Sequence, residues 1–243
     1  MTRIGIIGAA GRMGQAIAAT LAETAEAELA GGADEGGDIV ALARRSDVLV
    51  DFSVPAALEG NLAAAGAAGV GLVVGTTGLD AVHQRLIEEA AARIPVLQSA
   101  NMSLGVNLLA HLVREAAARL GPDWDVEIVE MHHRAKVDAP SGTALLLGRA
   151  AAEGRGVDLD AVSDRGRDGI TGARTAGHIG FASLRGGSVA GDHQVILAAE
   201  GERIELGHRA ESRAIFARGA VQAALWLASR PAGRYGMEDV LGL

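Results

Sequence analysis

Apolar and polar positions in the first hundred residues alternate between short apolar runs and longer, alanine-rich segments of helical composition. The runs predicted to be strands are 3–7, 28–33, 47–52, 71–74 and 94–98. Helices are predicted after the first run, over 55–68 and over 79–93. Strands that alternate with helices predict a parallel, doubly wound sheet of the Rossmann-like α/β class.

The pattern changes after residue 102. An amphipathic helix is predicted over 104–120, then a strand over 124–130 and a helix from Thr143, with Ser141 as its N-cap. Strands are predicted at 178–185, 188–199 and 203–209, best paired antiparallel with a turn at Glu200 and Gly201. A last helix, over 213–229, is expected to pack on the first domain. We therefore predict a dinucleotide-binding domain, 1–102 plus 214–243, and a second α+β domain, 103–213, on a mixed or antiparallel sheet.

Composition and charge narrow the classes of partner. The 243 residues are 49% hydrophobic, enough to bury a core. The net charge of -8, without a cluster of Lys and Arg, argues against nucleic acid or an anionic membrane as partner. No apolar run approaches the roughly 18 to 20 residues that span a bilayer, so we expect a cytoplasmic protein. The absence of cysteine excludes disulfides and thiolate chemistry, and we predict no metal site.

A glycine turn, G-x-x-G-x-x-G over residues 8–14, joins the first strand to the first helix. Such a turn lets backbone amides approach a pyrophosphate at a helix N-terminus, although it also fits a helix packed closely on a strand. Asp34 lies twenty residues beyond Gly14, where an acidic residue binds ribose hydroxyls. Glu35 follows, and its charge would repel a 2′-phosphate, so NADH is favoured over NADPH unless Arg44 or Arg45 folds back.

A second glycine turn follows the strand over 71–74 and comprises Gly75, Thr76, Thr77 and Gly78. Ligands of such sheets bind outside the carboxyl ends of the strands, so this turn is a candidate for the nicotinamide end of the cofactor. A purely structural turn fits the spacing equally well.

The candidate chemistry lies in the segment 130–143. His132, His133 and Lys136 follow a predicted strand, and Ser141 and Gly142 begin a predicted helix. A helix start presents amides and the positive end of its dipole to a carboxylate or phosphate. A single histidine is more often structural. Core packing, however, does not require bases on one side of a loop and, on the other, an anion-binding helix start at Ser141, Gly142 and Thr143, which we call the anion seat.

Three segments carry a resemblance to a known family: EMHHRAKVDAPSGTAL from residue 130, GAAGRMG from residue 8 and GTTG from residue 75. Over essentially the whole chain, the sequence resembles 4-hydroxy-tetrahydrodipicolinate reductase. The resemblance implies NADH- or NADPH-dependent reduction of 4-hydroxy-tetrahydrodipicolinate to tetrahydrodipicolinate, with hydride delivered to ring C4, in the diaminopimelate route to lysine. It also implies a homotetramer built through the sheet of the second, substrate-binding domain.

The resemblance also implies roles for individual residues. His132 and Lys136 become proton donors, His133 a substrate ligand, and Ser141, Gly142 and Thr143 the seat of a substrate carboxylate. The chain departs from the family pattern at Glu35, where an NADPH-tolerant member has arginine, which again favours NADH. The implied cofactor-binding residues are Gly8, Ala9, Ala10, Gly11, Arg12, Met13, Asp34, Gly75, Thr76, Thr77, Ser99, Ala100, Asn101 and Met102.

Two other functions also fit the sequence. Another imine or carbonyl reductase of the Rossmann type would use the same glycine turns but does not call for the paired histidines, the lysine and the Ser-Gly-Thr helix start. A non-catalytic, NAD-binding redox sensor would bind NADH without oxidising it, and would tolerate the loss of His132 and Lys136.

Overall fold

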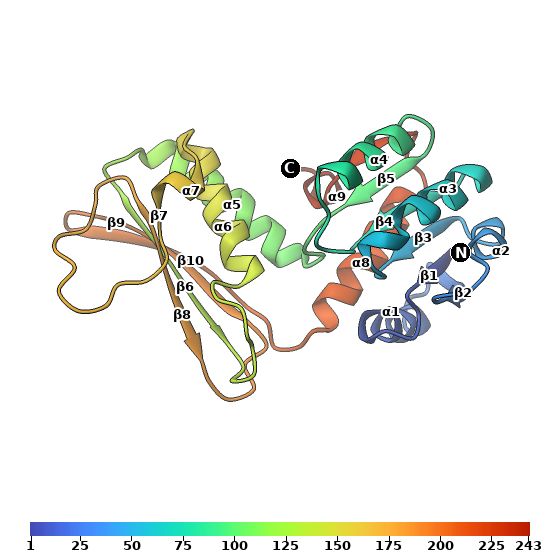
Figure 1. The fold of residues 1–243 in the computed structure, drawn as a ribbon, viewed down its shortest axis with the longest axis horizontal. Helices are drawn as coiled ribbons and strands as arrows, with labels where there is room; N and C mark the ends of the chain where they lie inside the picture. The colour runs from blue at the N-terminus through green and yellow to red at the C-terminus, as the bar shows by residue number, and fades with distance from the viewer. The chain divides into compact units, whose positions relative to one another are not determined.

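The computed structural model describes residues 1–243, which divide into two compact units, each with its own sheet and hydrophobic core (Figure 1). The first unit comprises Met1–Leu104 and Ala214–Leu243, and the second comprises Gly105–Arg213.

The first unit is built on a six-stranded parallel sheet in the order β11-β5-β4-β3-β1-β2. Short apolar runs form its central strands, because strands covered by helices on both faces need no polar alternation. The bounds are β1 Thr2–Ile7, β2 Ala27–Ala33, β3 Val48–Asp51, β4 Gly71–Val74, β5 Pro95–Gln98 and β11 Gly233–Tyr235.

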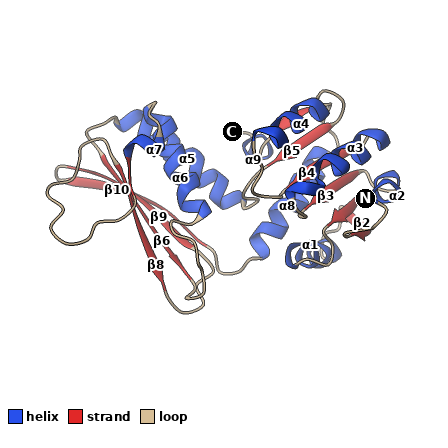
Figure 2. Ribbon diagram, viewed as in Figure 1, coloured by secondary structure: helices blue, strands red, loops and turns tan.

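Helices cover both faces of this sheet (Figure 2). Val48 and Val50 of β3 contact α1 and α8 in one core, whereas Leu49, between them, belongs to the core under α2, α3 and α4. As predicted, the helix after residue 213 packs on the first unit. The bounds are α1 Arg12–Ala22, α2 Ile39–Arg44, η1 Pro55–Ala57, α3 Leu58–Ala68, α4 Ala81–Ala91, α8 Ala214–Leu227 and α9 Met237–Leu241.

The second unit is built on a five-stranded mixed sheet in the order β10-β9-β6-β8-β7. β9 and β10 form the predicted antiparallel hairpin through Glu200 and Gly201, with φ +80° at Gly201. The antiparallel expectation is wrong for β8, which pairs in parallel with β6, while β6 separates β8 from β9. The bounds are β6 Asp125–His132, β7 Ser163–Asp164, β8 Ile179–Arg185, β9 Asp192–Ala199 and β10 Glu202–Arg209.

Helices cover only one face of this second sheet (Figure 2). The helices are α5 Leu104–Leu120, α6 Gly142–Arg155 and α7 Leu159–Val162. Val126 and Ile128 of β6 are buried in the core with Val195 and Leu197 of β9. The alternate positions of these strands face away from that core and are half-buried, and Leu184 of β8 is 49% exposed. The second sheet therefore has one open face that carries apolar side chains.

Five short elements have no counterpart in the sequence prediction: α2, α7, β7, β11 and α9. None is longer than six residues, too short for a periodic pattern to develop. None of the helices is long and apolar enough to cross a membrane.

Candidate active site

The start of α6 has the geometry of an anion seat. Ser141 is the N-cap: it has extended backbone angles, is 2% exposed, and its Oγ accepts a hydrogen bond of 3.1 Å from the Ala144 amide. Gly142, the first helical residue, is exposed, and a Cβ built on it would meet no atom within 4 Å. The helix dipole and the first-turn amides therefore face open space that an anion can enter.

His132 is the last residue of β6, and its ring is fixed by a buried carboxylate. His132 Nδ1 lies 2.5 Å from Glu130 Oε2, and Glu130 is only 1% exposed. Arg185 of β8 donates to both oxygens of Glu130, at 2.9 and 2.8 Å. Burial opposes ionisation of Glu130, but the hydrogen bonds from Arg185 and His132 outweigh it and hold the pKa of Glu130 below its ordinary value. The ionised Glu130 thus accepts the Nδ1 proton of His132 and leaves Nε2 for chemistry.

The loop after β6 carries the other two predicted bases. Lys136 Nζ lies 2.7 and 2.8 Å from the carboxylate oxygens of Asp138, and this lysine holds the pKa of Asp138 below its ordinary value. His133 Nε2 accepts a hydrogen bond of 3.2 Å from Arg213. Arg185 also donates to the Asp138 carbonyl, at 2.7 Å, which ties the loop to the sheet.

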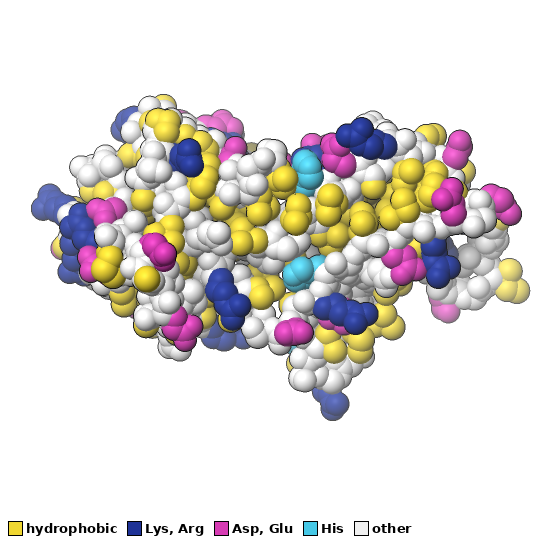
Figure 3. Space-filling view, turned by 180° about the vertical axis from the view of Figure 1, so that it is seen from behind, with side chains coloured by type: hydrophobic (Ala, Val, Ile, Leu, Met, Phe, Trp, Pro, Cys, Tyr) yellow, Lys and Arg dark blue, Asp and Glu magenta, His cyan; other side chains and the backbone are white.

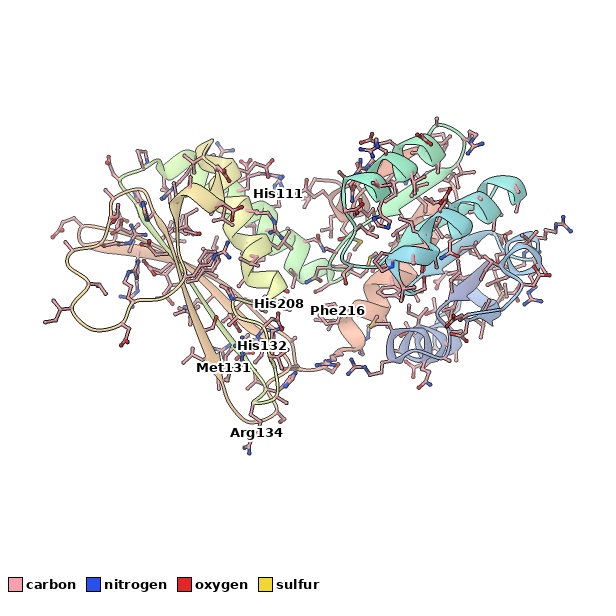
Figure 4. The ribbon with its side chains drawn as sticks, in the orientation of Figure 1. His111, Met131, His132, Arg134, His208 and Phe216 are labelled. Carbon is pink, nitrogen blue, oxygen red and sulfur yellow. The ribbon has the colours of Figure 1, made fainter.

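His193 of β9 connects the two halves of this site. Its Nε2 lies 3.0 Å from Ser141 Oγ, and its ring meets the His132 ring edge-on, with 5.1 Å between centroids. Figure 4 shows Met131 and His132 at the end of β6, with His208 of β10 at the same end of the sheet. The structure therefore brings together His132, Ser141 and Gly142, as the sequence predicts, and it does so through His193, which the sequence did not indicate.

The first glycine turn is shaped for close approach of a ligand. Gly8 has φ +80°, and a Cβ on Gly14 would stand 2.3 Å from the Gly8 carbonyl oxygen. Gly8 and Gly11 line a cavity of about 600 Å³ together with Asp34 and Glu35. Since Gly8 and Gly14 leave no room for a side chain, and the turn opens on a cavity beside a helix start, these residues fit the pyrophosphate and ribose of a dinucleotide.

The Asp34 carboxylate accepts hydrogen bonds of 3.0 and 3.2 Å from the Ala10 amide, which links the end of β2 to the glycine turn. No Lys or Arg lines the cavity. Arg45 instead lies over Gly31 of β2, where its guanidinium is 2.8 Å from the position that a Cβ would take.

The second glycine turn is held by Asp51, a fully buried carboxylate at the end of β3. Asp51 accepts hydrogen bonds from Asn61 Nδ2 at 3.0 Å and Thr76 Oγ1 at 3.2 Å, and from the amide and hydroxyl of Ser53. This network fixes Gly75 and Thr76 at the carboxyl edge of the sheet, whereas Thr77 is exposed.

The remaining predicted cofactor residues differ in accessibility. Ala10, Arg12 and Ala100 are exposed, and Ser99 makes a local turn with Asn101 through two hydrogen bonds. Met102 is 2% exposed and packs in the core, as Met13 does in part, so their side chains are not available to a ligand. At Met102 only the backbone can take the predicted role.

The arginine-rich connection before β8 is tied to the strands around it. Arg174 pairs with Asp125 and Glu127, and Arg167 also pairs with Glu127. Acidic and basic side chains are likewise interspersed over the face shown in Figure 3. No group of three or more His, Asp and Glu side chains is arranged to hold a metal ion.

Glu130, Arg185, His193 and Asp51, like Asp138 and Arg213, belong to these sites but were not predicted from the sequence. The spacing of Glu130 and His132 was informative, because residues two apart on a strand share a face. His193 precedes Val195 and Leu197 in strict alternation, which marks a polar residue on the core face. Arg185 has no such signal, since its place opposite His132 depends on the parallel pairing of β6 with β8.

The first unit has a parallel sheet with a glycine turn and an acidic residue at the next strand end. The second unit has an oriented histidine beside an anion seat. Together these features define the class of protein: a pyridine-nucleotide-dependent oxidoreductase. The chain belongs to the dihydrodipicolinate reductase family. Residues 2–102 match the N-terminal part of that family and residues 105–241 its C-terminus.

Similar proteins agree with this assignment over the full length. The chain is 61% identical to the 4-hydroxy-tetrahydrodipicolinate reductase of Zymomonas mobilis, over 99% of this chain and 97% of the relative. It is 53% identical to the enzyme of the same name from Parvibaculum lavamentivorans, over 99% and 98%. Among solved structures, a dipicolinate-bound dihydrodipicolinate reductase from Paenisporosarcina superposes with a TM-score of 0.79 at 26% identity, over 98% of this chain and 99% of that one. A probable dehydrogenase from Thermotoga maritima, 13% identical, shares the fold with a TM-score of 0.63.

Proposed function

We propose that this protein reduces 4-hydroxy-tetrahydrodipicolinate to tetrahydrodipicolinate with NADH, in the diaminopimelate route to lysine, and that it acts in the cytoplasm. The observation that carries the proposal is the geometry of His132, which is oriented by buried Glu130 and joined through His193 to the anion seat at Ser141. An acid beside an anion seat suits a carboxylated substrate that gains a proton during reduction.

Substrate binding uses the second unit. The substrate is a cyclic imine with two carboxylates, and its charge is complementary to the start of α6 and to the cations of the preceding loop. One carboxylate binds the Ser141 hydroxyl and the backbone of Gly142 and Thr143. His133, supported by Arg213, contacts the substrate beside it. Lys136 exchanges Asp138 for the substrate, because the Lys136–Asp138 pair lies in the loop and Asp138 is exposed.

The reduction requires a hydride and a proton. A bound nicotinamide supplies the hydride, which goes to ring C4 of the dehydrated substrate. His132 Nε2 delivers the proton that the resulting enamine needs, and Glu130 stabilises the charged imidazole through Nδ1. Lys136 is the second candidate donor of that single proton and, as a positive charge near the ring, favours electron flow towards the ring nitrogen.

The preference for NADH rests on the cavity beside the glycine turn. Asp34 and Glu35 contribute two carboxylates to its lining, which contains no Lys or Arg; Arg12, in the same glycine turn, is exposed and is not part of that lining. A 2′-phosphate would therefore be repelled without a compensating ion pair. Arg45, which would offset that repulsion, lies over Gly31 instead.

The open face of the second sheet supports the proposed homotetramer. Its half-buried residues include Val129, Met131 and Ile196, and Leu184 is exposed. A sheet face without covering helices buries apolar surface when it packs on another copy of itself.

The acid role is tested with His132→Gln. Gln keeps a polar side chain but cannot deliver a proton, so we expect unchanged NADH affinity by calorimetry and a loss of about 10²- to 10⁴-fold in kcat. His83→Gln, in α4 of the first unit, is the matched control, because His83 only caps its own helix with Asp80. Full turnover by His132→Gln would refute the role of His132 as the acid. If the protein were instead a redox sensor, the wild type itself would bind NADH without any turnover.

A further inference from the structure

Ser141 and His193 form a hydrogen-bonded pair inside the second unit, away from solvent. Ser141 is 2% exposed and His193 6% exposed, and 3.0 Å separates Ser141 Oγ from His193 Nε2. A histidine on the core face of a strand normally costs stability unless its polar atoms are satisfied. Only one ring nitrogen of His193, Nε2, has a hydrogen-bond partner, since Nδ1 is buried and has none.

The hydrogen-bonding capacity of Ser141 limits what this pair can do. A serine hydroxyl has two acceptor sites and one proton. The Ala144 amide uses one acceptor site, at 3.1 Å. If His193 carries its proton on Nε2, it fills the second acceptor site, and the Ser141 proton is then the only part of the hydroxyl still able to bond. It then points away from both partners and is available to an anion at the start of α6.

The opposite tautomer is less favourable. A proton on His193 Nδ1 would bury an N–H donor that has no partner, and such orphaned donors are rare in proteins. It would also turn the Ser141 proton towards His193 and away from a ligand. Burial of the His193 ring, together with the neighbouring His132, His208 and Lys136, lowers its pKa to about 4 despite the opposing charge of Glu130. His193 is therefore neutral near pH 7 and carries a single ring proton.

We infer that His193 is a positioning residue that directs the hydroxyl of Ser141 onto a carboxylate of the substrate. The inference rests on the proposed function and deepens it: His193 acts through the Ser141 hydroxyl, to which it is hydrogen-bonded. It gives the buried His193 a role distinct from that of His132, although their rings are in contact.

Substitution of His193 by Gln or by Asn tests this role, because the side-chain amides of these two residues differ in length. In His193→Gln, the amide nitrogen reaches the position of Nε2 and can still donate to Ser141. In His193→Asn, it reaches only the position of Nδ1. We expect His193→Asn to raise the KM for substrate about 3- to 10-fold, a fraction of the 10- to 100-fold associated with a whole hydrogen bond to a charged group. Gln should restore KM towards the wild-type value, and kcat should change less than KM.

A double-mutant cycle shows whether the effect passes through Ser141. In Ser141→Ala the hydroxyl is gone, so adding His193→Asn should raise KM no further. The dissociation constant of pyridine-2,6-dicarboxylate, measured by calorimetry, should follow the same pattern without any turnover. Equal KM values for wild type, Asn and Gln, or additive effects in the cycle, would overturn the inference. Failure of the proposed function is distinguishable, because the wild type would then show no turnover.

Discussion

Glu130→Gln tests the electrostatic core of the site. In the wild type, Glu130 Oε2 accepts from both His132 Nδ1 and Arg185, and Oε1 accepts from Arg185. Gln replaces one oxygen by an NH₂ group. At the Oε1 position that group meets Arg185 alone, so two donors face each other. At the Oε2 position it meets both Arg185 and His132 Nδ1, which forces the ring proton onto Nε2 and removes the partner of the charged imidazole.

The size of the effect follows from the bonds that change. A hydrogen bond to a charged group contributes about 1.5 to 3 kcal/mol, so losing the carboxylate at His132 should lower kcat about 10- to 100-fold. Arg185, with a side chain 21% exposed, also loses its counter-ion. Breaking a largely buried ion pair costs about 3 kcal/mol, and we expect a comparable drop in the free energy of unfolding.

Glu127→Gln provides the matched control on the same strand. Glu127 also pairs with two arginines, Arg167 and Arg174, but it points to the opposite face of β6 from Glu130. The control should lose stability and keep its kcat. Steady-state kinetics and urea unfolding of both variants separate the two effects. A kcat for Glu130→Gln within twofold of that for Glu127→Gln would refute the role assigned to Glu130.

Three further predictions concern the glycine turn, cofactor choice and acid stability. Gly14→Ala should lower the free energy of unfolding in urea by about 1 to 3 kcal/mol and weaken NADH binding, because the added Cβ would lie 2.3 Å from the Gly8 carbonyl oxygen. Gly60→Ala is the control and should not destabilise the protein, because open space surrounds Gly60. Glu35→Arg should lower the KM for NADPH about 10-fold, and Glu35→Gln less; an unchanged NADPH KM in both would contradict the repulsion argument. The pKa of His193 is lowered from 6.5 to about 4, so only the unfolded chain takes up this proton between those values. As pH falls through that window, the wild type should therefore lose about 3 kcal/mol more unfolding free energy than His193→Gln. Equal losses of unfolding free energy in the two proteins would show that His193 does not titrate in this way.

The first unit was largely predictable from the sequence, because its buried parallel strands are short, continuous apolar runs separated by helices. β11 was not, because a three-residue strand has no period and its pairing with β5 joins residues more than 130 apart in the sequence. In the second unit, local patterns predicted the β9–β10 hairpin. They did not predict that β6 lies between β8 and β9, since that order depends on long-range pairing.

The candidate site shows the same division. His132, Ser141 and Gly142 were found from the sequence because a base-rich strand end and a helix start lie close together in the chain. The strand was expected to end at Glu130 and instead runs to His132, which places both residues on one face of β6. Arg185 and His193 are 53 and 61 residues beyond His132, and only the sheet brings them to it.

The most direct test of the account is to mix the purified protein with freshly prepared 4-hydroxy-tetrahydrodipicolinate and either NADH or NADPH, and to follow the nicotinamide absorbance. We predict rapid, substrate-dependent loss of the NADH signal and slower loss with NADPH. No loss with either cofactor, from a protein shown by calorimetry to bind NADH, would contradict the proposed reaction.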